Sequence, residues 1–308
     1  MIHRIGWACV TRGLGLSTNR TFRLSSLSPQ RLLDAAERNV REMRGILEWM
    51  EPRGFRMLRL GQSLVPFASH PAVLGNPEFD WETPLAPLLA AIGAEYAAKG
   101  FRFSMHPGQY AVLNSPREDV QRSAQDELAY SCRVLDLMGL DATHKVVLHG
   151  GAAYGDPEGS LKRMGDAILA LPQHLRRRLV LENDEKTYAF DAIVQLCERT
   201  GTPPVFDIFH HRLLPCGDLP ALLDRAAALW TQSPEHGRPK VHLSSQMPGA
   251  RTGKHADDIE DADIMDLCST LTFDADLMVE AKAKEDAALH VQSVLAGAHC
   301  LAGWHREK

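Results

Sequence analysis

The sequence predicts a single (β/α)₈ barrel. Eight short β-type runs alternate with amphipathic segments from one end of the 308-residue chain to the other. Such alternation indicates parallel strands joined by helices, and eight units of this size fill one barrel. No G-x-G-x-x-G sequence follows a predicted strand. This absence argues against the alternative of a doubly wound, dinucleotide-binding sheet, and we expect no nucleotide cofactor.

The strands and helices follow from the apolar pattern. Strands are expected at 3–10, 55–60, 101–105, 145–149, 178–182, 203–207, 239–243 and 276–280. The first helix should begin at Ser28-Pro29, because serine is a good N-cap and proline suits the first helical position. Its apolar residues, from Leu32 to Met50, recur mostly at spacings of three and four. Further helices are expected at 84–98, 117–138, 158–171, 189–198, 218–230, 260–268 and 284–297.

The composition is that of an ordinary globular domain. Apolar residues make up 44% of the chain and charged residues 24%, so we expect one domain over 1–308, with a short C-terminal extension of unknown role from about 298. No apolar run reaches the ~20 residues of a membrane span. Arg4 interrupts the N-terminal apolar stretch, which argues against a signal peptide and predicts a cytoplasmic protein. We also expect a monomer.

The chemistry should lie where the strands end, because the catalytic residues of such barrels occupy that face. Six consecutive predicted strands deliver a histidine or a carboxylate there. These residues are His106, His149, Glu182, Asp207, His242 and Glu280, with His210 and His255 in the following loops and His70 after the second strand. Imidazole and carboxylate ligands without a thiolate are typical of Zn, Mn, Fe or Co sites. Five histidines and three carboxylates are too many for one ion and fit two or three.

Lys240 raises a separate question. It lies two residues before His242, so both side chains should share one face of the strand. An ammonium group beside metal cations would be repelled. The lysine could therefore bind substrate phosphate, lose its proton or be carbamylated. The alternative is a lysine whose amine reaches out of the barrel mouth.

Several motifs together resemble the ultraviolet damage endonucleases, which are relatives of endonuclease IV among the xylose-isomerase-like barrels. They are TNRTFRL (18–24), SLVPFASH (63–70), SMHPGQY (104–110), VVLHGG (146–151), LENDE (181–185), VFDIFHH (205–211), KVHLSS (240–245), GKH (253–255) and MVEAKAKE (278–285). The resemblance covers about residues 3 to 290. It implies a DNA-repair endonuclease that hydrolyses the phosphodiester immediately 5′ to cyclobutane dimers and 6-4 photoproducts in double-stranded DNA, and abasic sites as a further substrate.

The resemblance also implies roles for particular residues. Three divalent ions, Mn²⁺ first with Zn²⁺, Co²⁺ and Mg²⁺ as alternatives, would be held by His106, His149, Glu182, Asp207, His210, His242, His255 and Glu280. Glu182 would bridge two ions, His70 would be a ligand or catalytic participant, and Lys240 would be carbamylated. Gln109 and Tyr110 would probe the lesion. Trp7 stands where the family usually has tyrosine and would still stack on DNA. Gly61-Gln62 replaces the usual Ser-Ser, which leaves the lesion preference open.

The net charge of -5 argues mildly against DNA binding, unless bound cations offset it. Candidate phosphate contacts are Arg20, Arg251, Lys254 and Lys282, each in an expected loop at the metal end. Three alternatives share the barrel: an abasic-site endonuclease of the endonuclease IV type, a metal-dependent sugar isomerase and a non-catalytic metal-binding scaffold. The sugar isomerase would not need His210 and His255.

Overall fold

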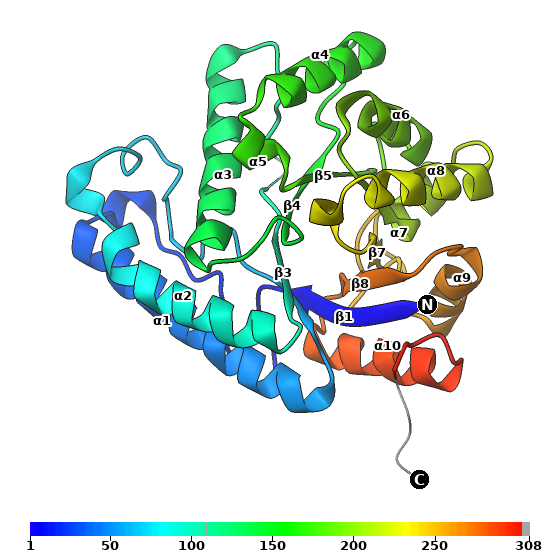
Figure 1. Cartoon of the computed structure of the whole chain (residues 1–308), viewed down its shortest axis with the longest axis horizontal. Helices are drawn as coiled ribbons and strands as arrows, with labels where there is room; N and C mark the ends of the chain where they lie inside the picture. Colours follow the sequence, from blue (N-terminus) through cyan, green and yellow to red (C-terminus); the bar gives the residue numbers. More distant parts are fainter. Residues whose placement is uncertain (109, 304–308) are drawn as a thin grey trace.

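Eight parallel strands close into a barrel in chain order, which confirms the predicted fold class (Figure 1). The computed structural model describes residues 1–108 and 110–303. The strands are β1 (Ile2–Ala8), β2 (Met57–Arg59), β3 (Arg102–Met105), β4 (Lys145–His149), β5 (Leu179–Glu182), β6 (Pro204–Asp207), β7 (Lys240–Leu243) and β8 (Ala275–Val279). Parallel pairing of β8 with β1 closes the ring, so all eight carboxyl ends open on one face.

Helices cover the outside of the barrel, and those predicted lie within a few residues of their expected bounds. They are α1 (Pro29–Met50), α2 (Glu82–Ala98), α3 (Glu118–Leu137), α4 (Pro157–Ala170), α6 (Phe190–Thr200), α8 (Leu219–Thr231), α9 (Asp261–Thr270) and α10 (Glu285–Gly297). The Ser28 side chain caps α1 by accepting a hydrogen bond from the Arg31 amide, as expected. Two short helices, α5 (Gln173–Arg176) and α7 (Ile208–Leu213), have no counterpart in the sequence prediction.

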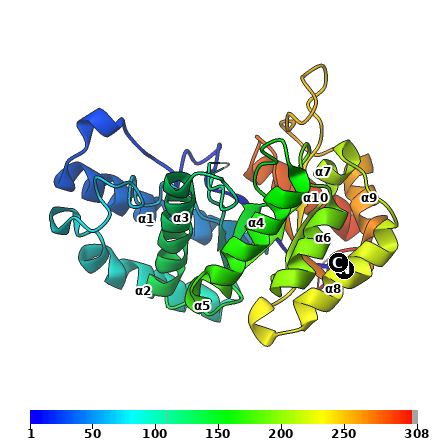
Figure 2. The same ribbon diagram turned by 90° about the horizontal axis from the view of Figure 1, so that it is seen from above.

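The first strand ends two residues earlier than predicted. Cys9 has φ 67°, a left-handed conformation that stops the strand after Ala8. Its amide donates to the Arg59 carbonyl, and Val10 then pairs with Ser17 in an isolated antiparallel bridge. The loop after β1 therefore folds back over the carboxyl end of the barrel. Figure 2 shows the blue, green and gold loops after β1, β4 and β7 projecting from the same side of the molecule.

Trp7 belongs to the core between the barrel and α1. Its side chain is fully buried and meets Trp49 and Phe55 edge to face, at ring-centroid distances of 5.8 and 5.2 Å. The indole N–H donates to the Val10 carbonyl. The prediction that Trp7 stacks on DNA is therefore wrong, because its ring packs under the helical layer and has no surface left for a base.

The amino ends of the strands carry a buried charge network, at the opposite end from the predicted site. Asp276 accepts hydrogen bonds from Arg102 and Arg4 at 2.9 and 3.0 Å. Lys145, the first residue of β4, donates to the carbonyl oxygens of Arg177 and Glu235. These pairings satisfy charges that burial would otherwise make costly.

Lys145 should make stability depend on pH. Burial, reinforced by Arg102 and Arg178, lowers its pKa to about 7 in the folded protein, whereas an unfolded lysine has a pKa of about 10.4. Between these values the unfolded chain binds a proton that the folded chain does not, so stability should rise with pH. Denaturant unfolding from about pH 6 to about pH 9 should show the wild type gaining stability relative to Lys145→Met. Parallel pH profiles would contradict the assignment.

The end of the described chain packs against its beginning. The Ile2 amide donates to the Cys300 carbonyl, and the Ala302 amide donates to the Ile2 carbonyl. The first described residues of the predicted C-terminal extension thus lie beside β1. In the described part of the chain, none of the helices has the length and apolar character that a membrane crossing requires.

Candidate metal centre

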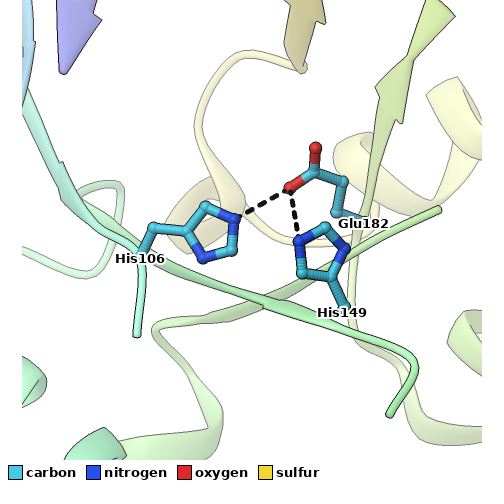
Figure 3. Close-up of side chains that lie close together, drawn as sticks. All are labelled: His106, His149 and Glu182. Atoms are coloured by element: carbon cyan, nitrogen blue, oxygen red, sulfur yellow. Dashed lines mark ion pairs between the residues drawn. The ribbon is translucent and has the colours of Figure 1, made fainter. Parts of the chain in front are cut away.

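Glu182 lies at the centre of the converging strand ends (Figure 3). One carboxylate oxygen, Oε2, is 3.2 Å from His106 Nε2 and 4.0 Å from His149 Nε2. The other, Oε1, is 2.8 Å from His242 Nδ1. The three histidines come from β4, β7 and the end of β3, so the barrel closure brings them together from distant parts of the chain.

A second group shares Glu182. The ligand atoms of Glu182, Asp207 and His242 lie within 4.8 Å of one another, as do those of His106, His149 and Glu182. Asp207 also accepts a hydrogen bond from the His210 amide, which starts α7 and turns the chain back. As a result His210 Nδ1 lies 3.6 Å from Asp207 Oδ2 and 3.7 Å from Glu182 Oε1.

Glu280 extends the cluster towards the loop after β7. Its Oε1 is 3.1 Å from His242 Nδ1, and its Oε2 is 3.9 Å from His255 Nδ1. The structure thus brings all eight residues that the sequence suggested as ligands into one continuous cluster. Six of the eight, all except Asp207 and His242, line a pocket of about 380 Å³ at the barrel mouth.

The cluster fits divalent ions by its unpaired atoms. Buried polar atoms in proteins nearly always have a hydrogen-bond partner. Among the described residues, four buried atoms of this cluster have none: His149 Nδ1, Glu182 Oε2, Asp207 Oδ2 and His242 Nε2. Nitrogen and carboxylate oxygen donors left free in this way are the ligands that a divalent metal takes.

The charges also suit a cation. Burial lowers the pKa of His106 to about 4, so its imidazole is neutral. Burial opposes protonation of His210, yet the carboxylates of Asp207 and Glu182 raise its pKa to about 9. Burial alone would raise the pKa of Glu280, but Arg59 and His242 hold it well below its usual value. Burial raises the pKa of Asp207 as well, so a bound divalent cation would take the place of the His210 proton and favour the ionised form of Asp207.

A sequence family decides between the candidate chemistries. The family described as UV-endonuclease UvdE matches residues 3–302. The chain belongs to this family of UV endonucleases. Membership of this family makes the chain a DNA-repair nuclease. The alternative of a metal-dependent sugar isomerase is therefore excluded.

Known relatives agree with the family assignment. A UV DNA damage endonuclease of Bacillus velezensis is 32% identical over 280 residues, which are 88% of this chain and 86% of the relative. The crystal structure of SacUVDE has a TM-score of 0.89 and 34% identity, and covers 97% of this chain and 100% of its own. Endonuclease IV from Thermus thermophilus has a TM-score of 0.56 with 17% identity, covering 96% and 99% of the two chains, and shows the shared fold.

Arg59 is a residue of this pocket that the sequence analysis missed. It ends β2 and donates to Glu280 Oε1 at 2.5 Å, with its side chain 13% exposed. Histidine and carboxylate side chains mark a metal site in a sequence, whereas an arginine at a strand end carries no such signature. Glu185 is a second such residue, since its Oε2 lies 3.9 Å from His210 Nε2.

Lys240 begins β7, two residues before the candidate metal ligand His242. Its side chain is buried, and Nζ donates to Ser104 Oγ at 2.6 Å. The alternative of an amine that reaches out of the barrel mouth is therefore wrong. Burial, with Arg59 and Arg102 nearby, lowers the pKa of Lys240 well below its usual value. A lowered pKa favours the neutral amine that carbamylation requires, and carbamylation stays a prediction.

His70 does not join the cluster. It lines a neighbouring pocket with Ser69 and Glu127, and its Nδ1 accepts a hydrogen bond from the Ala72 amide. Its expected role as a ligand or catalytic participant stays a prediction without support from this geometry.

The Gly61-Gln62 pair lies against the loop after β1. A Cβ at position 61 would collide with the Thr18 carbonyl and with Asn19, so the loop after β1 passes too close for a side chain at this position. Gln62 lines the metal pocket, and its amide donates to Glu127. Gln62 therefore forms part of the pocket wall, and its effect on lesion preference stays a prediction.

The residues expected to contact DNA fall into two groups. The Arg20 guanidinium forms an ion pair with Glu42 and donates a hydrogen bond to the Gly15 carbonyl, so it stabilises the loop in which it lies. Arg251, Lys254 and Lys282 are exposed at the metal end. Tyr110 is 92% exposed beyond His106, whereas Gln109 lies outside the described residues.

Proposed function

We propose that the cluster around Glu182 binds divalent metal ions, with which the protein hydrolyses the phosphodiester immediately 5′ to a UV photoproduct in double-stranded DNA. The proposal rests on a buried set of imidazoles and carboxylates that converge on one shared glutamate. Among the described residues, several of their polar atoms have no hydrogen-bond partner. The proposal includes cyclobutane dimers and 6-4 photoproducts as substrates, and abasic sites as a further one. It also includes a monomeric, cytoplasmic protein.

Three ions suit the three parts of the cluster. One group is His106, His149 and Glu182, and the next is Glu182, Asp207 and His242 with His210 beside them. Glu280 and His255 form the third part. Mn²⁺ is our first choice for a donor set of nitrogen and oxygen, and Zn²⁺, Co²⁺ and Mg²⁺ are the alternatives. Bound divalent ions polarise phosphoryl oxygens and lower the pKa of water.

The protein's own side chains position the DNA. Arg59 fixes the Glu280 carboxylate at the pocket wall. Arg251, Lys254 and Lys282 stand exposed around the mouth and would contact phosphates without reading sequence. The exposed ring of Tyr110 would enter the duplex where a damaged pair has lost its stacking, which is where unstacking requires least free energy.

The deciding experiment is the nicking of a UV-irradiated duplex oligonucleotide with Mn²⁺ and with a chelator. We expect a cut immediately 5′ to the photoproduct that leaves a 3′-hydroxyl and a 5′-phosphate, and we expect the chelator to abolish it. An unirradiated duplex is the control. Cleavage of an abasic duplex alone would favour the endonuclease IV type of activity. Metal binding without cleavage of any of these duplexes would favour the non-catalytic scaffold.

A further inference from the structure

Tyr154 is an exposed aromatic residue that neither the motifs nor the metal centre explains. It lies in the loop between β4 and α4, is 46% exposed and has φ 50°. A non-glycine residue in the left-handed region is strained, and such strain persists only where the surrounding structure imposes it. The loop therefore holds the backbone of Tyr154 in a conformation that a tyrosine residue disfavours.

Asn114 imposes the loop conformation. Its side chain is fully buried, and Nδ2 donates to the carbonyl oxygens of Gly150 and Ala152 at 3.3 and 2.9 Å, and to that of Ser160. Oδ1 accepts a hydrogen bond from the Ala152 amide. A single side chain thus pairs with three backbone groups of the neighbouring loop and with one in the first turn of α4.

Further hydrogen bonds fix the same loop. The Tyr188 hydroxyl lies 3.4 Å from the Ala152 carbonyl oxygen and 3.2 Å from that of Pro157, so its single hydrogen has two acceptors in and next to this loop. Ser160 Oγ donates to the Ala153 carbonyl at 2.6 Å. Because the backbone on both sides of Tyr154 is held, the exposed ring loses little conformational entropy when it binds.

The position of the loop relates Tyr154 to Tyr110. Asn114 comes four residues after Tyr110, in the loop that follows β3. The two loops and residues 184–187 after β5 line a pocket of about 180 Å³ beside His149, to which Gly108, Ala111, Gly151 and Ala152 contribute. Among the residues that the structure describes, Tyr110 and Tyr154 are the exposed Phe, Tyr or Trp side chains. Both lie on loops at the carboxyl end of the barrel, beside the candidate metal centre.

We propose that Tyr154 is a second DNA-stacking residue and that Asn114 is the positioning residue that holds it. The inference rests on the proposed function, because a duplex seated over the metal centre would meet both loops. An aromatic face stacks on bases or sugars of any sequence, which suits an enzyme that recognises deformation. Tyr110 would enter the duplex at the lesion, and Tyr154 would stack on the nucleic acid displaced beside it.

The test measures kcat and KM for irradiated duplex together with metal content. Tyr154→Ala should raise KM about tenfold and leave kcat and metal content unchanged, since stacking on one base accounts for an effect of this size. Tyr154→Phe keeps the ring and should retain the wild-type KM. Leu169→Ala, which removes another exposed apolar side chain on α4, is the matched control.

Two further variants separate stacking from a structural role. Tyr154→Gly should unfold at a higher temperature than Tyr154→Ala, because glycine adopts a positive φ without strain, and yet show the same raised KM. Asn114→Asp loses the donated hydrogen bonds and should also raise KM. Adding Tyr154→Ala to Asn114→Asp should then raise KM no further. Full additivity of the two effects would overturn the positioning role of Asn114.

The outcomes distinguish this inference from the proposed function. If the wild type cleaves and Tyr154→Ala has the wild-type KM, Tyr154 does not stack on DNA, although the proposed function stands. If the wild type does not cleave, the proposed function fails, and the affinity for irradiated duplex is compared instead. A weaker affinity of Tyr154→Ala would then support the stacking role, and an equal affinity would overturn it.

Discussion

Replacing Glu182 with glutamine should lower the cleavage of irradiated DNA by about a thousandfold or more, because one residue serves both compact ligand groups. One carboxylate oxygen faces His106 and His149, and the other faces His242. Glutamine has nearly the same size, but it loses the charge and replaces one acceptor with an amide donor. Metal content should fall together with activity.

The measurement is single-turnover cleavage with elemental analysis of the purified protein. Glu78→Gln, an exposed change of the same chemistry in the short helix Pro77–Phe79, serves as the control. Thermal unfolding establishes that Glu182→Gln is folded. A variant that keeps both its metal and its activity would show that the reaction does not depend on this cluster.

Replacing Trp7 with alanine should lower the free energy of unfolding by about 3–5 kcal/mol, the range for loss of a large aromatic side chain from a packed core. The indole is fully buried and contacts both Trp49 and Phe55, so its removal leaves a cavity between β1 and α1. The KM of the folded variant for irradiated DNA should stay at the wild-type value.

Denaturant unfolding measures the first effect, and steady-state cleavage well below the unfolding temperature measures the second. Tyr110→Ala should show the opposite pattern, with unchanged stability and impaired lesion cleavage, because its ring is exposed. A Trp7→Ala protein that had wild-type stability but bound damaged DNA weakly would show that the indole contacts DNA.

The sequence by itself determined the order of the elements and the members of the candidate metal cluster. Alternating strands and helices allow few topologies, and a closed parallel barrel places every strand's carboxyl end on one face. Residues such as His149, Glu182 and Asp207 could therefore be grouped from their positions at predicted strand ends, although no contact between them was known. The structure brings them together around Glu182.

Tertiary structure alone decided which way individual side chains face and what holds them. Strands of a parallel barrel are buried on both faces, so apolar neighbours of Trp7 do not reveal whether its indole points to the core or to the mouth. A Cβ at Gly6 would collide with the Met57 carbonyl, and the adjacent Trp7 packs under α1. Sequence patterns likewise gave no sign that the Lys240 amine is buried and donates to Ser104.

The Asn114 contact shows the same physical limit. Its hydrogen bonds join two loops from different strands, and their partners are backbone atoms, which carry no sequence signature. Periodicity and motifs report the preferences of a segment for a helix, a strand or a ligand role. Contacts between loops depend on how the closed barrel sets neighbouring strands side by side, and only the folded chain fixes that arrangement.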